Sequence, residues 1–298
     1  MEFKLLNTLQ GHQNPIYSLS IDQKNNTLYS AGNDKGIVEW DLETQKFKRV
    51  LCAVPSSVYV LRNIPNTDLL IAGLRSGGIY IINTVEQKLV AKLDVEKGAV
   101  FSLEILIAKN ELVAVDEYGK AYVWNLANYE LLYSFNVSST TVRSIAIHDK
   151  KGVLAFGDKN GQITICSSLD YHVLLRKKIH ESSVSSLCII DDILYSGGRD
   201  AKMYKLNIDD LSVVNEIVPH MFTIYGIQST KNKQLVTISR DKTIKVWSED
   251  FKLLKNVSRD KSIDSHYLSI NSITYNSNTN IICTAGDDKL IKVWEIVN

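Results

Sequence analysis

Residues Ile282 to Trp294, which read ICTAGDDKLIKVW, are the clearest copy of a unit that recurs seven times along this chain. Each copy rises through an apolar run to small residues, crosses a tight turn and continues as an apolar strand. The copies end near residues 40, 82, 124, 166, 206, 247 and 294, so successive copies lie 40 to 47 residues apart. A fixed period in this range indicates a supersecondary unit that buries its faces only by stacking on its neighbours.

Length and composition fit one array of repeats. A chain of 298 residues would by its length suggest about two domains. The repeats, however, run through the whole sequence without a linker, so we expect residues 1–298 to form a single domain. Apolar residues make up 45% and charged residues 22% of the chain, as in an ordinary globular protein. The net charge of +1 argues against a strongly basic nucleic-acid-binding protein.

No sequence feature indicates a membrane-spanning or secreted protein. The opening residues, MEFKLLNTLQGH, contain no signal peptide, and no uninterrupted run of about 18 apolar residues occurs. The four cysteines lie in different repeats without the CxxC spacing of a metal or redox site: Cys52, Cys166, Cys188 and Cys283. We therefore expect buried reduced thiols, a cytoplasmic location and no cofactor.

The first repeat has the pattern of four short antiparallel strands, in which apolar and polar residues alternate and turn clusters intervene. Its expected strands lie at residues 16–21, 28–32, 37–41 and 46–51. In other repeats glycine follows Ser76, Tyr118 and Asn160, where a tight hairpin requires a positive φ. Because helical periodicity is absent throughout, the sequence predicts an all-β fold, a seven-bladed β-propeller of four-stranded blades.

The two ends of the sequence are expected to complete one blade together. The seventh repeat is one strand short of four, whereas residues 3–9 precede the first full repeat and have no other partner. We expect residues 3–9 to supply the missing strand, which would close the ring and leave no open sheet edge. Deleting residues 1–9 should then destabilise the fold far more than trimming a free terminus does.

Three repeats carry a full set of four residues at constant spacing: a histidine before the first strand, a Ser or Thr in the second, an Asp at the turn and a Trp ending the third. The sets are His12, Ser30, Asp34 and Trp40; His220, Thr237, Asp241 and Trp247; and His266, Thr284, Asp288 and Trp294. On these residues the chain resembles the WD-repeat (WD40) β-propellers over essentially its whole length. The resemblance implies that each set forms a buried hydrogen-bonded network within one blade.

The other repeats depart from this pattern. The fifth keeps His180, Ser196 and Asp200 but has Leu206 in place of the tryptophan. The second to fourth lack the histidine, and at their turn Asp position stand Ser76, Tyr118 and Asn160. The complete sets thus flank the closure seam, and we expect blades 2–4 to rely on packing instead. Because the His, Ser or Thr and Asp trio recurs once per repeat, we predict a structural role for it and no catalytic or metal-binding residue.

In propellers of this family, the loops before the first strand and after the second surround one mouth of the central channel, where partners commonly dock. The residue just after the first apolar residue of each inner strand is expected to point at this mouth. These mouth residues are Tyr17, Tyr59, Phe101, Arg143, Ser185, Tyr225 and Asn271. Four of the seven are aromatic, against 8% of the chain, and large rings beside water anchor interfaces at low entropic cost. Filling of the channel top without any binding is the alternative.

A second ring is expected from the residue before each turn Asp position. Its members are Asn33, Arg75, Glu117, Lys159, Arg199, Arg240 and Asp287. The two rings together carry five positive and two negative charges, or +3, whereas the rest of the chain sums to −2. Aromatic residues beside a basic arc on blades 4 to 6 suit a peptide with an apolar anchor next to acidic or phosphorylated residues. Ordinary solvated charge is the alternative, both for the arc and for the polar insertion at residues 258–266.

The sequence therefore predicts a non-enzymatic scaffold, monomeric by default, that binds protein or peptide partners at the channel mouth. An enzyme or small-ligand propeller that uses the channel as its pocket is the alternative, although the two rings supply only Glu117 and Asp287 as acids. Nucleic acid or anionic lipid on the basic arc is a third possibility, which the near-neutral net charge disfavours.

Overall fold

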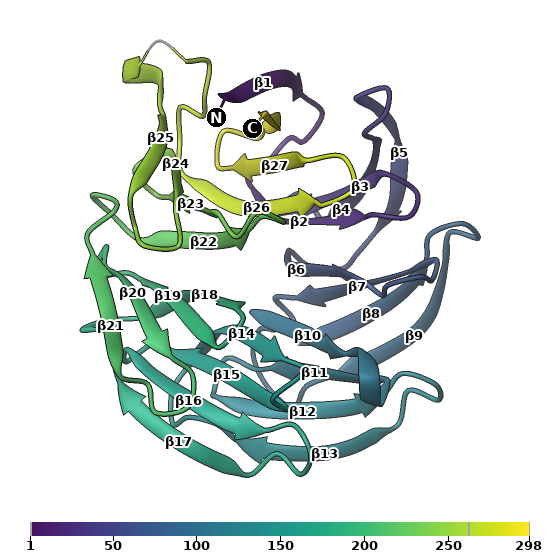
Figure 1. Ribbon diagram of the computed structural model, residues 1–298. Coiled ribbons are helices and arrows are strands. Elements are labelled where there is room, and N and C mark those ends of the chain that lie inside the picture. Colours follow the sequence, from purple (N-terminus) through teal and green to yellow (C-terminus); the bar gives the residue numbers. More distant parts are fainter. Residues whose placement is uncertain (1, 262, 298) are drawn as a thin grey trace.

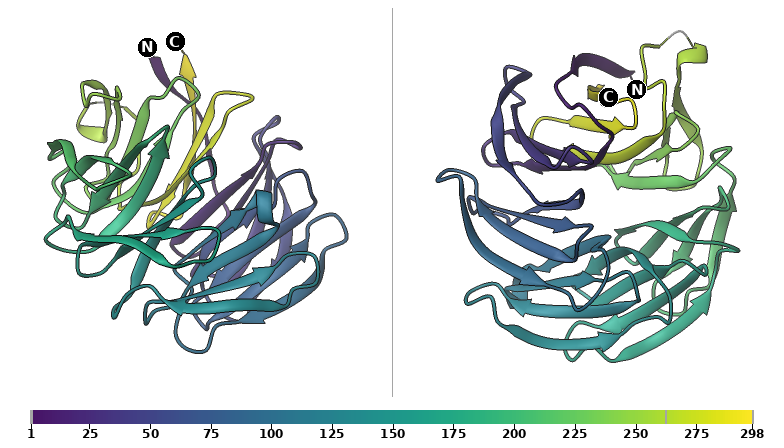
Figure 2. Two further views of the ribbon diagram at one scale, coloured as in Figure 1. Left: turned by 60° about the horizontal axis from the view of Figure 1, so that its bottom comes forward. Right: turned by 180° about the vertical axis from the view of Figure 1, so that it is seen from behind.

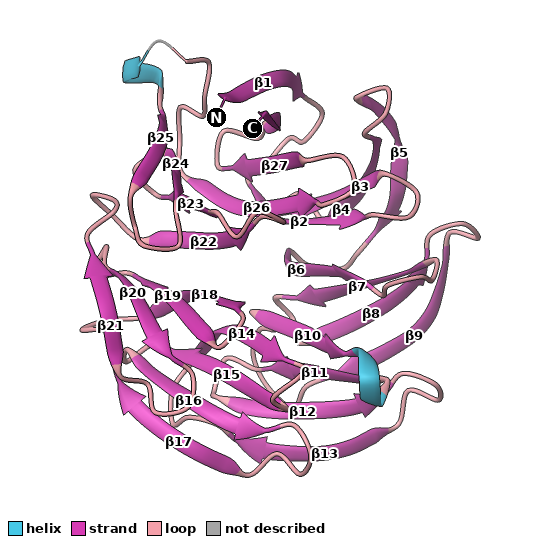
Figure 3. Ribbon diagram, in the orientation of Figure 1, coloured by secondary structure: helices cyan, strands magenta, loops and turns pink. Residues whose placement is uncertain are grey.

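Short alternating segments separated by tight turns give this chain strands and no α-helix within residues 2–261 and 263–297, which the computed structural model describes. The strands pair into seven four-stranded antiparallel sheets (Figures 1 and 3). Each sheet is one blade, and the blades follow one another radially in chain order, from purple to yellow (Figure 2). The prediction of an all-β, seven-bladed propeller is confirmed.

Each blade has an inner, a second, a third and an outer strand. The inner strands are β2 (Ile16–Asp22), β6 (Val58–Asn63), β10 (Ser102–Leu106), β14 (Val142–His148), β18 (Val184–Ile190), β22 (Ile224–Ser229) and β26 (Ile270–Asn276). The second strands are β3 (Thr27–Gly32), β7 (Leu69–Leu74), β11 (Glu111–Val115), β15 (Val153–Asp158), β19 (Ile193–Gly198), β23 (Leu235–Ser239) and β27 (Ile281–Gly286).

The third and outer strands lie progressively farther from the axis. The third strands are β4 (Gly36–Asp41), β8 (Gly78–Asn83), β12 (Lys120–Asn125), β16 (Gln162–Ser167), β20 (Met203–Asn207), β24 (Ile244–Trp247) and β28 (Ile291–Val297). The outer strands are β5 (Lys46–Ala53), β9 (Lys88–Asp94), β13 (Leu131–Asn136), β17 (Val173–Lys178), β21 (Val213–Ile217), β25 (Leu253–Val257) and β1 (Glu2–Leu9). Two 3-10 turns, η1 (Ile107–Lys109) and η2 (Arg259–Lys261), lie in connections between strands.

The apolar core is divided among the seams between blades. Seven buried clusters are present among the described residues, and each joins two adjacent blades. At the first seam, Tyr29 and Ile37 of blade 1 pack in one cluster with Leu61 and Leu70 of blade 2. A blade therefore buries its faces only against its neighbours, as the repeat period requires.

Strand β1 closes the ring by pairing antiparallel with β28, so that Phe3 lies opposite Ile296 and Leu9 opposite Ile291. The Phe3 ring packs on Trp294 with centroids 5.2 Å apart. The two ends of the chain lie side by side at this blade (Figures 1 and 2). The predicted completion of the seventh blade by the N-terminal strand is confirmed.

The turn between the second and third strands requires a left-handed backbone in every blade. Gly77, Gly119 and Gly161 supply it in blades 2–4 with φ of 93°, 85° and 85°. At Gly161 a Cβ atom would lie 2.0 Å from the carbonyl oxygen of His180, so a larger residue cannot fit there. None of the helical turns in the described part of the chain is long and apolar enough to cross a membrane.

Candidate partner-binding site at the channel mouth

The three complete residue sets form hydrogen-bonded chains inside their blades. In blade 1, Trp40 Nε1 donates to Ser30 Oγ over 2.7 Å, and Ser30 Oγ lies 2.6 Å from His12 Nε2. His12 Nδ1 in turn lies 2.6 Å from an Asp34 carboxylate oxygen. The same arrangement recurs in blade 7. Trp294 Nε1 donates to Thr284 Oγ1 over 2.9 Å, Thr284 Oγ1 lies 2.9 Å from His266 Nε2, and His266 Nδ1 lies 2.8 Å from Asp288.

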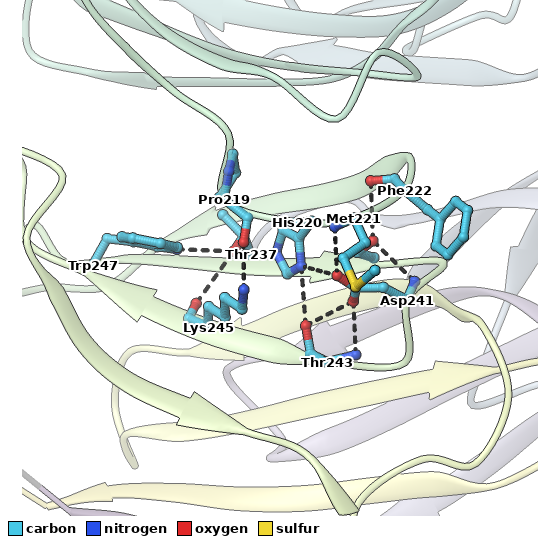
Figure 4. A network of polar contacts seen from close by, with 10 residues as sticks. Pro219, His220, Met221, Phe222, Thr237, Asp241, Thr243, Lys245 and Trp247 are labelled. Carbon is cyan, nitrogen blue, oxygen red and sulfur yellow. Dashed lines mark hydrogen bonds and ion pairs between the residues drawn. The ribbon is translucent and has the colours of Figure 1, made fainter. Parts of the chain in front are cut away.

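Blade 6 has the most connected of these networks (Figure 4). Trp247 Nε1 donates to Thr237 Oγ1, which lies 2.8 Å from His220 Nε2, and His220 Nδ1 lies 2.9 Å from Asp241. Burial opposes ionisation of Asp241, but bonds from His220, from Thr243 and from a backbone N–H hold its pKa well below its usual range. Burial lowers the pKa of His220 below its ordinary value despite the neighbouring Asp241 carboxylate.

The incomplete blades show what replaces a missing member. In blade 5, His180 contacts Ser196 at 3.0 Å and Asp200 at 2.9 Å, whereas buried Leu206 packs without a hydrogen bond. In blades 3 and 4 the turn carboxylate comes from residues two positions earlier than the expected site, Asp116 and Asp158.

Asp116 Oδ1 accepts from the backbone N–H groups of Tyr118 and Lys120, and Asp158 Oδ1 accepts in the same way from Asn160 and Gln162. In both blades the aspartate stands three residues before the glycine of the turn, Gly119 or Gly161. An Asp at this distance from a turn glycine is the sequence signal that could have identified these two carboxylates.

A cavity of about 780 Å³ is enclosed by the seven inner strands. All seven mouth residues line it: Tyr17, Tyr59, Phe101, Arg143, Ser185, Tyr225 and Asn271. None of the network residues of blades 1, 6 and 7 lies in its wall, so each network lies within its own blade, away from the channel. The mouth residues are thus the side chains that a ligand entering the channel from this end would meet.

β-Bulges place these side chains. In six inner strands the pairing with the second strand skips the mouth residue, for example between Ile16 and Ser18 in β2 and between Val142 and Ser144 in β14. In blade 3 the mouth residue Phe101 directly precedes β10. A bulge leaves its extra residue unpaired and re-aims the side chain, which here turns it from the blade interior toward the channel.

Four mouth residues on consecutive blades form a continuous stack. The Tyr17 and Tyr59 rings meet edge to face with centroids 5.7 Å apart, and Tyr59 and Phe101 are stacked at 5.1 Å with planes 8° apart. The Arg143 guanidinium lies over the Phe101 ring at 3.9 Å. We call Tyr17, Tyr59, Phe101 and Arg143 the aromatic crescent. Such contacts fix ring orientations before any ligand arrives.

The other side of the mouth is more polar. Ser185 donates to the carbonyl oxygen of Ile224 over 2.7 Å, and the Asn271 amide donates to the carbonyl of Ile16 and to Asp287. Tyr225 stands there as an aromatic residue that is 38% exposed. The mouth therefore has one aromatic side and one hydrogen-bonded side.

The second ring surrounds the cavity without lining it. Its members Asn33, Arg75, Glu117, Lys159, Arg199, Arg240 and Asp287 are all absent from the channel wall. Four of them act on the crescent. Burial lowers the pKa of Arg143, the Glu117 carboxylate opposes this shift, and Arg199 adds to it. Burial likewise raises the pKa of Tyr17, with Asp287 adding to the shift and Arg75 opposing it.

Lys159 and Arg240 lie apart from the crescent. Lys159 lines a separate hollow beside Lys178 and Glu181, and the Arg240 guanidinium lies 6.0 Å from the centre of the Phe222 ring. The structure thus brings together the seven mouth residues, whereas the basic arc is spread around the rim.

Deeper in the channel lie two features that sequence reasoning missed. Arg62 Nη2 donates to Glu104 over 2.7 Å, which pairs two charges between blades 2 and 3. Serine directly follows the mouth residue in five repeats: Ser18, Ser102, Ser144, Ser186 and Ser272. Three of these hydroxyls accept a backbone N–H from the next blade, for example from Leu61 to Ser18 over 2.8 Å. The recurrence of serine at this position is the sequence signal that could have identified these contacts between blades.

The insertion after β25 is anchored on blade 7. Lys292, whose side chain is 2% exposed, reaches Asp264 with its ammonium 2.9 Å from the carboxylate. Ile263 packs against the apolar cluster between blades 6 and 7. The part of the chain that the structure describes contains no group of three or more His, Cys, Asp or Glu side chains placed to hold a metal ion.

Comparison with known proteins finds matches to parts of this chain. A family model described as "WD domain, G-beta repeat" matches residues 3–41 and 258–295, which include the complete networks of blades 1 and 7. The "Peptidylprolyl isomerase domain and WD repeat-containing protein 1" of Homo sapiens is 30% identical over 97 residues, which cover 33% of this chain and 15% of that protein. The protein of the same name from Mus musculus matches equally well.

The "Periodic tryptophan protein 2" of Saccharomyces cerevisiae is 31% identical over 110 residues, which cover 36% of this chain and 12% of that protein. The chain therefore matches only a small part of the length of these relatives. Together with the seven four-stranded blades, these matches support a WD-repeat β-propeller with seven repeats.

Proposed function

Because this chain is a WD-repeat β-propeller with seven repeats, we propose that it is a non-enzymatic scaffold that binds a protein or peptide partner at the channel mouth. WD-repeat relatives support an interaction role in general. The observation that carries the finer proposal is the aromatic crescent, which is continuous over four blades and opens into a cavity of about 780 Å³.

The crescent suits an apolar or aromatic anchor. Its rings already stack on one another, so little side-chain freedom is lost when a partner side chain packs against Tyr59 or Phe101. Aromatic and arginine residues are also the side chains that dominate binding energy at protein interfaces. We infer that a bulky partner side chain enters the mouth between the crescent and Tyr225.

The charge around the mouth favours an acidic or phosphorylated neighbour to that anchor. Arg143 ends the crescent on the side of Arg199, and its planar guanidinium can donate two parallel bonds to a carboxylate or phosphate. The charged groups farther inside, Arg62 and Glu104, are paired with each other. This pairing supports recognition at the mouth over chemistry on a small molecule deeper in the channel.

Synthetic peptides test the proposal. Each peptide would carry one Phe anchor beside Glu, phosphoserine, serine or lysine, and its Kd would be measured by fluorescence polarisation. We expect the acidic and phosphorylated peptides to bind best, and Y59A/F101A to weaken them by about tenfold or more. R143Q should abolish the preference for phosphoserine over serine while leaving the serine peptide nearly unaffected.

A matched control is Y133A, which removes an exposed tyrosine from the outer strand β13. Equal Kd values for wild type and Y59A/F101A would contradict the proposal. Binding that follows only the total negative charge of any polyanion and collapses steeply with salt would instead support nucleic acid on the basic arc.

We further propose a cytoplasmic, monomeric protein. All four cysteines are free thiols, which suits a reducing compartment. Burial raises the pKa of the Cys188 thiol to about 11, so this channel-lining cysteine is unreactive.

A further inference from the structure

In four blades the two residues after the buried histidine hold the same place in the loop. The backbone N–H of the first residue donates to the turn aspartate in every case, from Gln13, Glu181, Met221 and Tyr267 over 3.4, 3.1, 3.0 and 3.2 Å. This bond fixes the loop in the same way in each blade. The first residue is exposed in all four blades, and the second is exposed or partly exposed.

The chemistry of these two positions differs sharply between blades. Blade 1 has Gln13 and Asn14, and blade 5 has Glu181 and Ser182, so the loop folds with polar residues. Blade 6 instead has Met221 and Phe222, which are 81% and 53% exposed. Adjacent blade 7 has Tyr267 and Leu268, which are 46% and 41% exposed. The fold does not require apolar residues here, and neighbouring exposed apolar side chains mark interaction sites.

We call Met221, Phe222, Tyr267 and Leu268 the apolar patch. Figure 4 shows Phe222 on the side of the blade 6 network away from Trp247, with its ring directed away from the network. None of the four residues lines the channel cavity. The apolar patch is therefore a surface distinct from the aromatic crescent. Both belong to the same end of the propeller, because Thr223, whose carbonyl accepts the Arg240 backbone N–H over 3.0 Å, lies between Phe222 and the mouth residue Tyr225 in the chain.

Arginine side chains lie beside the two rings of the apolar patch. The guanidinium of Arg240 lies 6.0 Å from the Phe222 ring centre, and that of Arg259 lies 6.0 Å from the Tyr267 ring centre. The turns and the insertion of blades 6 and 7 supply five cations without an ion pair among the described residues: Arg240, Lys242, Arg259, Lys261 and Lys289. Among the described residues, four nearby carboxylates have no lysine or arginine partner: Asp260, Asp287, Asp241 and Asp288. The last two are nearly or fully buried against His220 and His266, so the exposed charge beside the apolar patch is predominantly positive.

We propose that the apolar patch binds a partner protein segment that presents two bulky apolar side chains flanked by aspartate or glutamate. The exposed Met, Phe, Tyr and Leu side chains supply the apolar contact, and the five cations supply the complementary charge. The Tyr267 hydroxyl donates to the carbonyl oxygen of Asp288 over 3.3 Å, which lays this ring along the blade 7 turn. A ring held flat in this way suits packing against side chains better than insertion into a lipid bilayer.

A library of random peptides displayed on phage and selected on the full chain tests this inference. The patch variants replace apolar residues by those that the same loop carries elsewhere: M221Q/F222N takes the blade 1 residues, and Y267E/L268S takes the blade 5 residues. Because the same loop carries these residues in blades 1 and 5, we expect both variants to fold, and far-ultraviolet circular dichroism checks this. The matched control is Q13A/N14A, and Y59A/F101A separates the crescent from the patch.

We expect a class of selected peptides with two bulky apolar residues and flanking acids, whose Kd rises about tenfold or more on both patch variants. The same peptides should bind Q13A/N14A and Y59A/F101A within about twofold of wild type. Peptides that bind all patch variants as well as wild type, or that lose affinity only on Y59A/F101A, would overturn the inference. Failure of the patch would leave crescent binding intact, so the two proposals fail separately.

Vesicles of phosphatidylcholine containing phosphatidylserine provide the last comparison. We expect wild type and both patch variants to remain unbound in a sedimentation assay. Sedimentation of wild type that M221Q/F222N abolishes would assign the apolar patch to a membrane surface and overturn the protein-segment proposal.

Discussion

The buried hydroxyl at the centre of each network should contribute more to the free energy of unfolding in a blade that has the tryptophan than in one that lacks it. Ser30 is fully buried, accepts from Trp40 Nε1 over 2.7 Å and contacts His12 Nε2 at 2.6 Å. S30A leaves both partners buried without this oxygen. Because a stranded buried polar group costs about 1–3 kcal/mol, S30A should lower the free energy of unfolding by about 2–4 kcal/mol.

Ser196 in blade 5 is the internal control. It is also fully buried and contacts His180 Nε2 at 3.0 Å, but Leu206 stands where the tryptophan would donate. S196A removes the same atom and strands one partner only. The excess loss in S30A over S196A therefore isolates the tryptophan bond, and we expect it to be about 1–3 kcal/mol.

Equilibrium unfolding in urea measures both variants, with tryptophan fluorescence and far-ultraviolet circular dichroism as separate probes. Coincident transitions by the two probes justify a single free energy of unfolding for each protein. Free energies for S30A and S196A that agree within about 0.3 kcal/mol would refute the reasoning, since the tryptophan bond would then contribute nothing.

Three further predictions concern closure, pH and local opening. F3A should cost about 3–5 kcal/mol because Phe3 is buried and packs on Trp294, and thermal unfolding should show no such loss for exposed K4A. The pKa of His220 is lowered by burial, so its stabilising effect is full above the unfolded value of 6.5 and declines as pH falls below it. The stability deficit of H220Q, measured by urea unfolding, should therefore shrink as the pH falls below 6.5, and a deficit that grows would be inconsistent. Amide hydrogen exchange should be faster in blades 2–4 than in blades 1, 6 and 7, and equal protection would argue against a stabilising role of the complete networks.

Much of the fold could be predicted because the repeat fixes the hydrogen-bond geometry. The constant distance from aspartate to tryptophan reflects one turn and one strand, so Asp34 and Trp40 identify a blade by themselves. The closure of the ring followed from counting strands at residues 3–9. The direction of the mouth side chains was harder to predict from alternation, because six of the seven lie at β-bulges that a period of two does not reveal.

Replacements within a network were the least predictable. In blade 4, Cys166 stands at the tryptophan position, and Phe156 stands where the hydroxyl belongs. Phe135 and Tyr171 complete the same buried cluster, with Phe135 packing edge to face on Phe156 at 6.3 Å. The exchange moves the aromatic ring from the third strand to the second and roughly conserves volume, which cores tolerate well. A single sequence position cannot show such a compensation between strands.

Whether the channel mouth binds a partner is tested most directly by affinity capture from native cell extract with quantitative mass spectrometry. Wild type would be compared with the folded variant Y17A/Y59A/R143E, which removes three residues of the aromatic crescent. We predict that specific proteins are retained by wild type and lost by the variant. Retention of the same proteins by both would contradict binding at the crescent and would assign it to another surface of the propeller.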